Sequence, residues 1–150
     1  MSDCISRVLE HKGRQVEAVS PDTMVLAAVE RMNERRIGAL LIVDTYRPGK
    51  PYRPIGIFTE RDVLTRVIAS GLDPRMTAVG DVMTRELVVV TPETTVAEAM
   101  TIITERRCRH LPVVDESGVC GVISAGNLTS WMVRDHERTI HDLHSYIQRA

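Results

Sequence analysis

Residues 19–44 read VSPDTMVLAAVERMNERRIGALLIVD, and residues 90–115 repeat them without a gap as VTPETTVAEAMTIITERRCRHLPVVD. Eleven of the 26 aligned positions are identical, at a constant offset of 71. The similarity resumes after a six-residue difference in length, where GIFT at 56–59 matches GVIS at 121–124. A duplicated unit of this size predicts two related halves with pseudo-twofold symmetry. The symmetry-related clefts between such halves are natural ligand sites.

Length and composition limit what the chain can be. With 150 residues, of which 43% are hydrophobic, it can form one domain or two small halves that share a core. The net charge of −1 gives no bulk attraction to nucleic acid or to an anionic membrane, and an aromatic content of 3% argues against a base-stacking platform. We therefore expect neither nucleic acid nor a membrane as a partner.

Cysteine usage and the N-terminal sequence bear on location. Cys4, Cys108 and Cys120 form no CxxC motif and leave an odd count, which predicts free thiols in a reducing compartment. The N-terminus has no apolar segment typical of a secretory signal, and the longest apolar run, Ala39 to Val43, is too short to span a bilayer. These features predict a cytoplasmic protein.

Hydrophobic periodicity and turn residues predict the same order of elements, β-α-β-β-α, in both halves. We expect helices to begin where a hydroxyl residue precedes proline, at Ser20-Pro21 and Thr91-Pro92, and again at Thr59 and Ser124. The strands are expected at residues 16–19, 38–43, 55–58, 87–90, 111–114 and 119–123, with a short first helix before residue 13, an exposed loop at 45–54 and a tail helix at 136–147.

The repeated unit resembles a known family. Its marks are an apolar strand that ends in Val-Asp (Val43-Asp44 and Val114-Asp115) and the pattern G-h-h-[ST]-x-x-[DN], in which h is apolar. In order and in duplicate, these resemble a tandem pair of CBS domains, a Bateman module. The strings IGALLIVD, GIFTERDVL and RHLPVVD are similar to those of stand-alone bacterial CBS-pair proteins. The single module comprises a first repeat at 12–70, a second repeat at 80–135 and a C-terminal helix at 136–150.

The resemblance implies a fold and a role. The fold class is α/β (α+β), with two β-α-β-β-α repeats, each a three-stranded sheet with flanking helices, packed with pseudo-twofold symmetry. The role is that of a regulatory, energy-sensing module, not an enzyme, that binds AMP, ADP, ATP or NAD(H) in the clefts between the repeats. No catalytic cofactor is implied. Expected partners are the adenine nucleotide, a second copy of the chain and a regulated protein.

The first motif, residues 56–62, is the best candidate for nucleotide contact. The resemblance implies that Asp62 accepts hydrogen bonds from the ribose hydroxyls and that Thr59 lies near the phosphate. A carboxylate can accept from a vicinal diol through two oxygens, a helix N-terminus favours phosphate, and Arg61 adds positive charge. Thr59-x-x-Asp62 also matches a helix capping box, and the two roles are compatible.

The second motif departs from the family pattern, because Asn127 stands where Asp is usual, three residues after Ser124. Asn keeps one acceptor oxygen but has no charge. A neutral hydrogen bond contributes about 1 kcal/mol, against about 1.5–3 kcal/mol for a bond to a charged group. The second site is therefore expected to be weaker, differently selective or empty.

The adenine base is expected between aliphatic side chains, with strand backbone reading its edge, as the resemblance implies. The matching segments are Ile37-Gly38-Ala39 and Cys108-Arg109-His110, of which Arg109 and His110 match positions that reach phosphates. Gly38 either lets a ligand approach closely or is a small residue where strand meets helix. The resemblance also implies ligand contacts at Val16, Ile57, Thr84 and Val122.

Two further sets of residues allow two interpretations each. Arg36, Arg61 and Arg107 either add charge for a phosphate or are solvated helix ends, and we expect Cys108 to be a small buried hydrophobe. His141 and His144 share a helical face, but without a clear third ligand we expect a solvated face or a dimer contact and no metal site.

The rival function is a ligand-free module that only mediates protein contacts. Asp62 together with Thr59 favours the sensor, and no P-loop or nucleophile-elbow motif indicates an enzyme. Unpaired apolar stripes also predict a homodimer, with contacts from residues 63–67 and 128–133 and from the tail.

Overall fold

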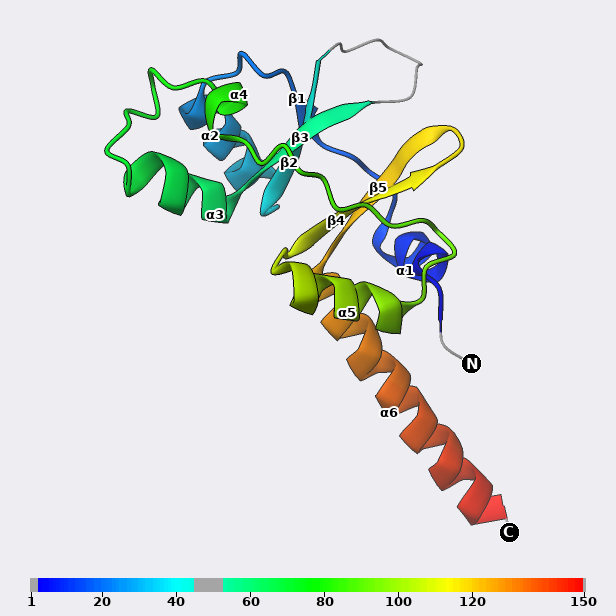
Figure 1. Ribbon diagram of the computed structural model, residues 1–150. Coiled ribbons are helices and arrows are strands. Elements are labelled where there is room, and N and C mark those ends of the chain that lie inside the picture. Colours follow the sequence, from blue (N-terminus) through cyan, green and yellow to red (C-terminus); the bar gives the residue numbers. More distant parts are fainter. Residues whose placement is uncertain (1–2, 45–52, 150) are drawn as a thin grey trace.

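The computed structural model describes residues 3–44 and 53–149, which fold into two halves around two small sheets (Figure 1). Of the loop expected at 45–54, all but the last two residues lies outside the described residues. The elements are α1 (Ile5–Lys12), β1 (Ala18–Val19), α2 (Val25–Arg35), β2 (Ala39–Val43), β3 (Pro54–Thr59), α3 (Glu60–Asp62), the π-helix η1 (Val63–Ile68), α4 (Val79–Val82), α5 (Val96–Arg106), β4 (His110–Asp115), β5 (Gly118–Ser124) and α6 (Ala125–Arg149).

The two sheets differ by one strand. In the first, β1 pairs parallel with β2, and β2 pairs antiparallel with β3, whereas in the second β4 and β5 form an antiparallel pair. The third strand expected at 87–90 is wrong, since only Val90 bridges to Val113. The reason is Pro112, which occupies the place of Leu41. The Leu41 N–H donates to the Glu17 carbonyl (3.0 Å), and proline has no N–H for the equivalent bond.

The helices α2 and α5, at equivalent places in the two halves, begin later than expected. α2 starts at Val25 and α5 at Val96, so the predicted starts at Ser20-Pro21 and Thr91-Pro92 are wrong. Both segments form turns instead, closed by a hydrogen bond of 3.1 Å from the N–H of residue 23 or 94 to the carbonyl of residue 20 or 91. The fixed φ of proline suits the second position of such a turn as well as the first turn of a helix.

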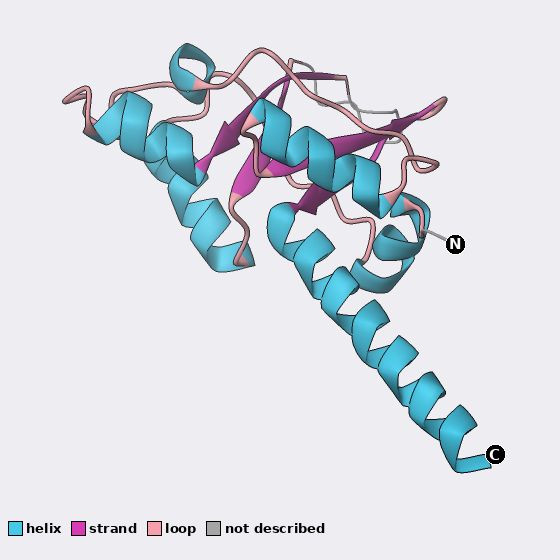
Figure 2. Ribbon diagram, turned by 60° about the horizontal axis from the view of Figure 1, so that its bottom comes forward, coloured by secondary structure: helices cyan, strands magenta, loops and turns pink. Residues whose placement is uncertain are grey.

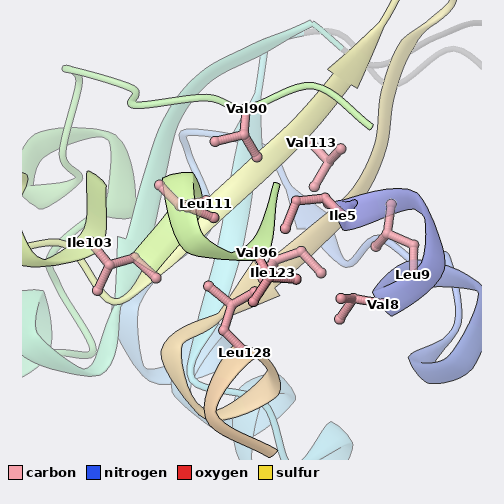
Figure 3. Close-up of a cluster of buried hydrophobic side chains, with 11 residues drawn as sticks. Ile5, Val8, Leu9, Val90, Val96, Ile103, Leu111, Val113, Ile123 and Leu128 are labelled. Carbon is pink, nitrogen blue, oxygen red and sulfur yellow. The ribbon is translucent and has the colours of Figure 1, made fainter. Parts of the chain in front are cut away.

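Each half completes its core with a helix that precedes the other half. α1 packs into the second half and α4 into the first. The contacts are symmetric: Ile5 N–H donates to the Thr94 carbonyl, and Val79 N–H donates to the Thr23 carbonyl, both at 2.8 Å. Figure 3 shows Ile5 and other α1 side chains within the buried cluster of the second half. The halves are therefore interlocked.

The glycine of each G-h-h-[ST] motif makes room for these exchanged segments. A Cβ on Gly56 would lie 2.5 Å from Met83 Sδ, just after α4, and a Cβ on Gly121 would lie 2.6 Å from Leu9 Cδ2 in α1. Both distances are below van der Waals contact. The motif glycines therefore have a packing role in both halves.

The helices that follow the two motifs begin as predicted but end differently. The helix after Thr59 continues as the π-helix η1, whereas α6 runs for 25 residues, so the tail helix expected at 136–147 is a continuation of it (Figure 2). Val67 and Leu128, expected in the dimer contact, are fully buried in their own halves. No helix in residues 3–44 and 53–149 is long and apolar enough to cross a membrane.

Candidate functional site

The larger of two clefts between the halves has a volume of about 650 Å³ and joins the first motif to the start of β4. It brings together most of the predicted site residues from both halves. Those that line it are Gly38, Ile57, Thr59, Arg61, Asp62, Thr84, Cys108, Arg109, His110 and Ser124. Glu60, Leu64, Thr65, Arg107, Ala125 and Gly126 complete the lining. We refer to it as the first cleft.

Asp62 is the one charged side chain that is buried in the described part of the chain, at 4% exposure. Its Oδ2 accepts hydrogen bonds from the Thr59 N–H (3.0 Å) and hydroxyl (3.2 Å), and its own N–H donates to Thr59 Oγ1 (3.4 Å). The capping box is thus confirmed. The other carboxylate oxygen, Asp62 Oδ1, accepts a hydrogen bond from the Thr84 hydroxyl at 3.1 Å. A ribose hydroxyl that binds Asp62 would have to share the carboxylate with the Thr84 hydroxyl or take the place of that hydroxyl.

Thr84 and Arg66 tie the inter-repeat linker to this carboxylate. Backbone hydrogen bonds of 2.9 and 2.8 Å join Thr84 to Ile57 in β3. Arg66 Nε lies 3.5 Å from Asp62 Oδ1, and Arg66 Nη1 donates to the Met83 carbonyl at 2.8 Å. Sequence reasoning missed Arg66, although its i, i+4 spacing from Asp62 is a signal for such a pair.

Positive charge reaches the first cleft from the second half. Arg107 ends α5 in the left-handed conformation (φ 53°, ψ 36°), and Arg36 ends α2 in the same way (φ 53°, ψ 45°). Glycine is usual at such a position, because a side chain there is strained. Arg61 Nη1 donates to the Arg107 carbonyl at 3.4 Å, which links the halves at the rim. Arg107 lines the first cleft and Arg36 lines the second, at equivalent positions in the two halves.

His110 stands between the two clefts and lines both. Burial lowers the pKa of its imidazole, and Arg109 and Lys12 lower it further, while Glu60 opposes them. The buried Nδ1 has no hydrogen-bond partner within the described chain. Burial therefore favours the neutral form of the His110 imidazole.

Gly38 also lines both clefts, and a side chain at this position would crowd two neighbouring side chains. A Cβ there would lie 2.9 Å from Glu60 Oε1 and 3.2 Å from His110 Nε2. The interpretation as a small residue between packed elements is thus supported. Glu60, which sequence reasoning did not single out, brings negative charge to the wall between the clefts.

The second cleft is smaller, about 180 Å³, and joins the second motif to the start of β2. Asn127 forms the same cap as Asp62: its Oδ1 accepts from the Ser124 N–H (2.9 Å), and its N–H donates to Ser124 Oγ (3.0 Å). The predicted residues Ile37, Gly38, Ala39, His110, Val122, Ser124 and Asn127 line it, together with Arg36.

Three residues before β1 also line the second cleft and were missed by sequence reasoning: Lys12, Gln15 and Glu17. The Lys12 ammonium donates to the Val122 carbonyl, and burial lowers its pKa. The predicted Val16 lines neither cleft. Side chains alternate along an extended chain, so residues on either side of Val16 face the cleft while Val16 does not.

The three cysteines and the two histidines His141 and His144 form no metal or disulfide site in the described ranges. All three cysteines are free and half-buried, and burial raises the pKa of Cys108 and of Cys120. His141 and His144 are exposed on α6, and no group of three or more potential metal ligands occurs in residues 3–44 and 53–149.

The family model described as CBS domain matches the chain twice, at residues 10–69 and 79–134. The chain belongs to the CBS-domain family. It is 38% identical over 153 residues to the mitochondrial CBS domain-containing protein CBSX3 of Arabidopsis thaliana. This alignment covers 98% of the present chain and 73% of CBSX3. It is 37% identical over 105 residues to CBSCBSPB2 of the same plant, covering 70% of this chain but 19% of that protein.

Solved CBS structures have the same fold. A CBS-domain protein from Agrobacterium tumefaciens superposes with a TM-score of 0.78 at 31% identity, covering 87% of this chain and 93% of that one. The tandem CBS pair and the α/β fold class predicted from the sequence are thus confirmed.

Proposed function

We propose that this CBS pair is a non-catalytic regulatory module that binds an adenosine nucleotide, AMP, ADP, ATP or NAD(H), in the first cleft. The observation that carries the proposal is the buried Asp62 carboxylate on one wall of that cleft, facing a wall from the other half that bears Arg107 and Arg109. Its volume of about 650 Å³ lies within the range of about 300–1,000 Å³ typical of small-molecule sites.

The lining residues suit the three parts of a nucleotide. Asp62 supplies a charged acceptor for the ribose diol, with the Thr84 hydroxyl as the group that yields its place. Arg107 and Arg109 supply positive charge for phosphate. Ile57 and the backbone around Cys108 supply an apolar face and an edge for adenine.

The second cleft is a weaker candidate on two independent grounds. Its volume of about 180 Å³ falls below the usual range for small-molecule sites, and Asn127 brings no charge to it. We therefore expect one nucleotide per chain.

A nucleotide in the first cleft would bind residues from both halves, so its presence would alter how firmly the halves are held together. We take this coupling to be the signal that a regulated partner protein receives. A cytoplasmic location stays a prediction, since the relative CBSX3 is named as mitochondrial.

Melting experiments test the proposal directly. A ligand bound only to the folded state raises the melting temperature by mass action, so at least one of AMP, ADP, ATP and NAD(H) should do so at millimolar concentration. Inosine nucleotides with the same number of phosphates keep the ribose and the charge, so they test whether adenine itself is recognised. No shift with any of the four, together with no heat in calorimetry, would exclude the nucleotide-binding role and leave the ligand-free assembly module.

A further inference from the structure

The two oxygens of the Asp62 carboxylate serve different parts of the chain. Oδ2 accepts both hydrogen bonds from Thr59 and belongs to the helix cap. Oδ1 accepts from the Thr84 hydroxyl at 3.1 Å and lies 3.5 Å from Arg66 Nε. Because Oδ2 already accepts two hydrogen bonds, Oδ1 is the oxygen at which a ligand in the first cleft has to bind.

Both partners of Asp62 Oδ1 are held to the inter-repeat linker, the segment 83–95 between α4 and α5. The Thr84 N–H donates to the Ile57 carbonyl at 2.8 Å, and the Ile57 N–H donates to the Thr84 carbonyl at 2.9 Å. Arg66 Nη1 donates to the carbonyl of the neighbouring Met83 at 2.8 Å. From this point the linker crosses to α5 in the second half (Figure 1). A change at Oδ1 therefore acts on the segment that joins the halves.

The second half forms its cap without such a bond. The Asn127 side chain accepts from the Ser124 N–H at 2.9 Å and, within residues 3–44 and 53–149, makes no hydrogen bond to the segment before β1. That segment instead contacts the second motif through the Lys12 ammonium, which donates to the Val122 carbonyl. The bond from Thr84 to Asp62 is therefore not a requirement of the capping motif, and it needs an explanation of its own.

We infer that the Thr84 hydroxyl and a nucleotide compete for Asp62 Oδ1, so that nucleotide binding releases one of the contacts that hold the inter-repeat linker. This competition rests on the proposed nucleotide site. It makes Thr84 an inhibitory side chain, in place of the ligand contact that the family resemblance implies. By linkage, the free energy that the Thr84 bond adds to the anchoring of the linker is lost from the affinity for the nucleotide.

The burial of Asp62 favours competition over sharing. Its side chain is in a residue that is 4% exposed, and Oδ1 already has two partners, which is the number of its lone pairs. A ribose hydroxyl therefore has to take the place of one of them. The Thr84 hydroxyl is the partner that yields, because it is neutral and donates in the same way as the ribose hydroxyl, whereas Arg66 is charged.

Calorimetric titration of AMP, ADP, ATP and NADH into threonine variants tests the competition. Thr84→Val removes the hydroxyl and should tighten binding about three- to tenfold, the size of one neutral hydrogen bond. Thr84→Ser keeps the hydroxyl and should bind as the wild type does. The matched control is Thr77→Val, which removes a hydroxyl that donates to the Asp73 carbonyl at 2.8 Å and should leave the affinity unchanged.

The outcomes separate this inference from the proposed function. Equal or weaker binding by Thr84→Val, with binding by the wild type, would overturn the competition while the nucleotide site stands. Absence of binding in the wild type and in every variant would remove the site itself, and the competition with it. Binding by Thr84→Val alone would show that the hydroxyl blocks the site completely.

Amide hydrogen exchange of the wild type, with and without the bound nucleotide, tests the release of the linker and needs no variant. The Thr84 and Ile57 amides should exchange about three- to tenfold faster when the nucleotide is bound, because one contact of the linker is lost. The reference is the pair of Val90 and Val114 amides, which are hydrogen-bonded in the second half. Unchanged or slower exchange relative to this pair would show that the nucleotide does not loosen the linker, and would contradict the inference.

Discussion

The first half places the carboxylate of Asp62 at the start of a short helix that continues as a π-helix, whereas the second half places the amide of Asn127 at the start of a 25-residue helix. Both side chains accept a hydrogen bond from the N–H of the residue three positions before them, and both helices are capped in the same way. Each motif glycine also makes room for an exchanged segment.

The comparison separates two duties of one motif. Capping and close packing need the glycine, the hydroxyl and an acceptor oxygen, and both halves retain all three. The negative charge is not needed for capping, since Asn127 does without it. The charge of Asp62 and the larger volume distinguish the first cleft, whereas each cleft has an arginine from the facing half, Arg107 in the first and Arg36 in the second. Our proposal of a ligand site therefore rests on that charge and volume and not on the motif alone.

The largest expected difference between the halves lies in the cores. Leu128→Ala should lower the free energy of unfolding by about 2–5 kcal/mol, because Leu128 is fully buried in the second core. Val63→Ala, at the equivalent place in the first half, should cost less, because Val63 is only half-buried. Urea denaturation of both variants measures the difference. Equal costs would mean that the two helices pack alike.

The motif glycines should show a smaller effect. Gly56→Ala and Gly121→Ala are each expected to destabilise the fold by about 1–3 kcal/mol through overpacking. Gly56→Ala should be the worse of the two, because its Cβ also lies 3.0 Å from the Thr84 carbonyl oxygen, whereas Gly121 faces only the Leu9 side chain.

Gly126→Ala is the control for the glycine variants, since its Cβ would meet nothing closer than Ser124 Oγ at 3.6 Å. If Gly121→Ala proved as stable as Gly126→Ala, α1 would not be packed against the second motif.

Replacing His110, which lies between the two clefts, should change the free energy of unfolding by a smaller amount that depends on pH. Burial lowers the pKa of His110 below its ordinary 6.5, so the unfolded chain takes up a proton that the folded chain resists. The free energy of unfolding should therefore fall as the pH drops below 6.5. His110→Ala, which copies Ala39 of the first half, should reduce this fall. The pKa of Asp115 is also lowered, but its contribution is lost only below 3.8, outside this window.

Denaturant melts of wild type and His110→Ala on both sides of pH 6.5 measure this slope. The same slope in both proteins would show that His110 is protonated as easily in the folded as in the unfolded chain.

The two repeats and the order of most of their helices and strands could be predicted from the sequence, because each element follows from the hydrophobic pattern of its own residues. The capping positions Thr59 and Ser124 were visible for the same reason. The proline after Ser20 led to a wrong prediction of a helix start, because proline is equally common in turns and at helix starts. The strand predicted at 87–90 does not form because Pro112, on the neighbouring strand β4, has no N–H to pair with it.

The parts of the site that could not be predicted come from distant segments. Lys12, Gln15 and Glu17 reach the second cleft, beside the second motif, from the end of α1 and the segment before β1. Arg66 is different, because it is four residues from Asp62 and this local spacing could have been recognised. Amphipathic patterning shows that α1 needs a core but not which half supplies it. That exchange is decided by tertiary packing.

The central claim is that a nucleotide binds in the first cleft through the charge of Asp62, and one calorimetric titration tests it most directly. The nucleotide that raises the melting temperature is titrated into wild type, Asp62→Asn and Asn127→Asp. Asparagine can keep the cap, as Asn127 shows, so Asp62→Asn removes chiefly the charge. We predict one site per chain and an affinity at least about tenfold lower in Asp62→Asn, which corresponds to about 1.4 kcal/mol. Asn127→Asp should not weaken this site. Unchanged affinity in Asp62→Asn, or two equal sites in the wild type, would contradict the account.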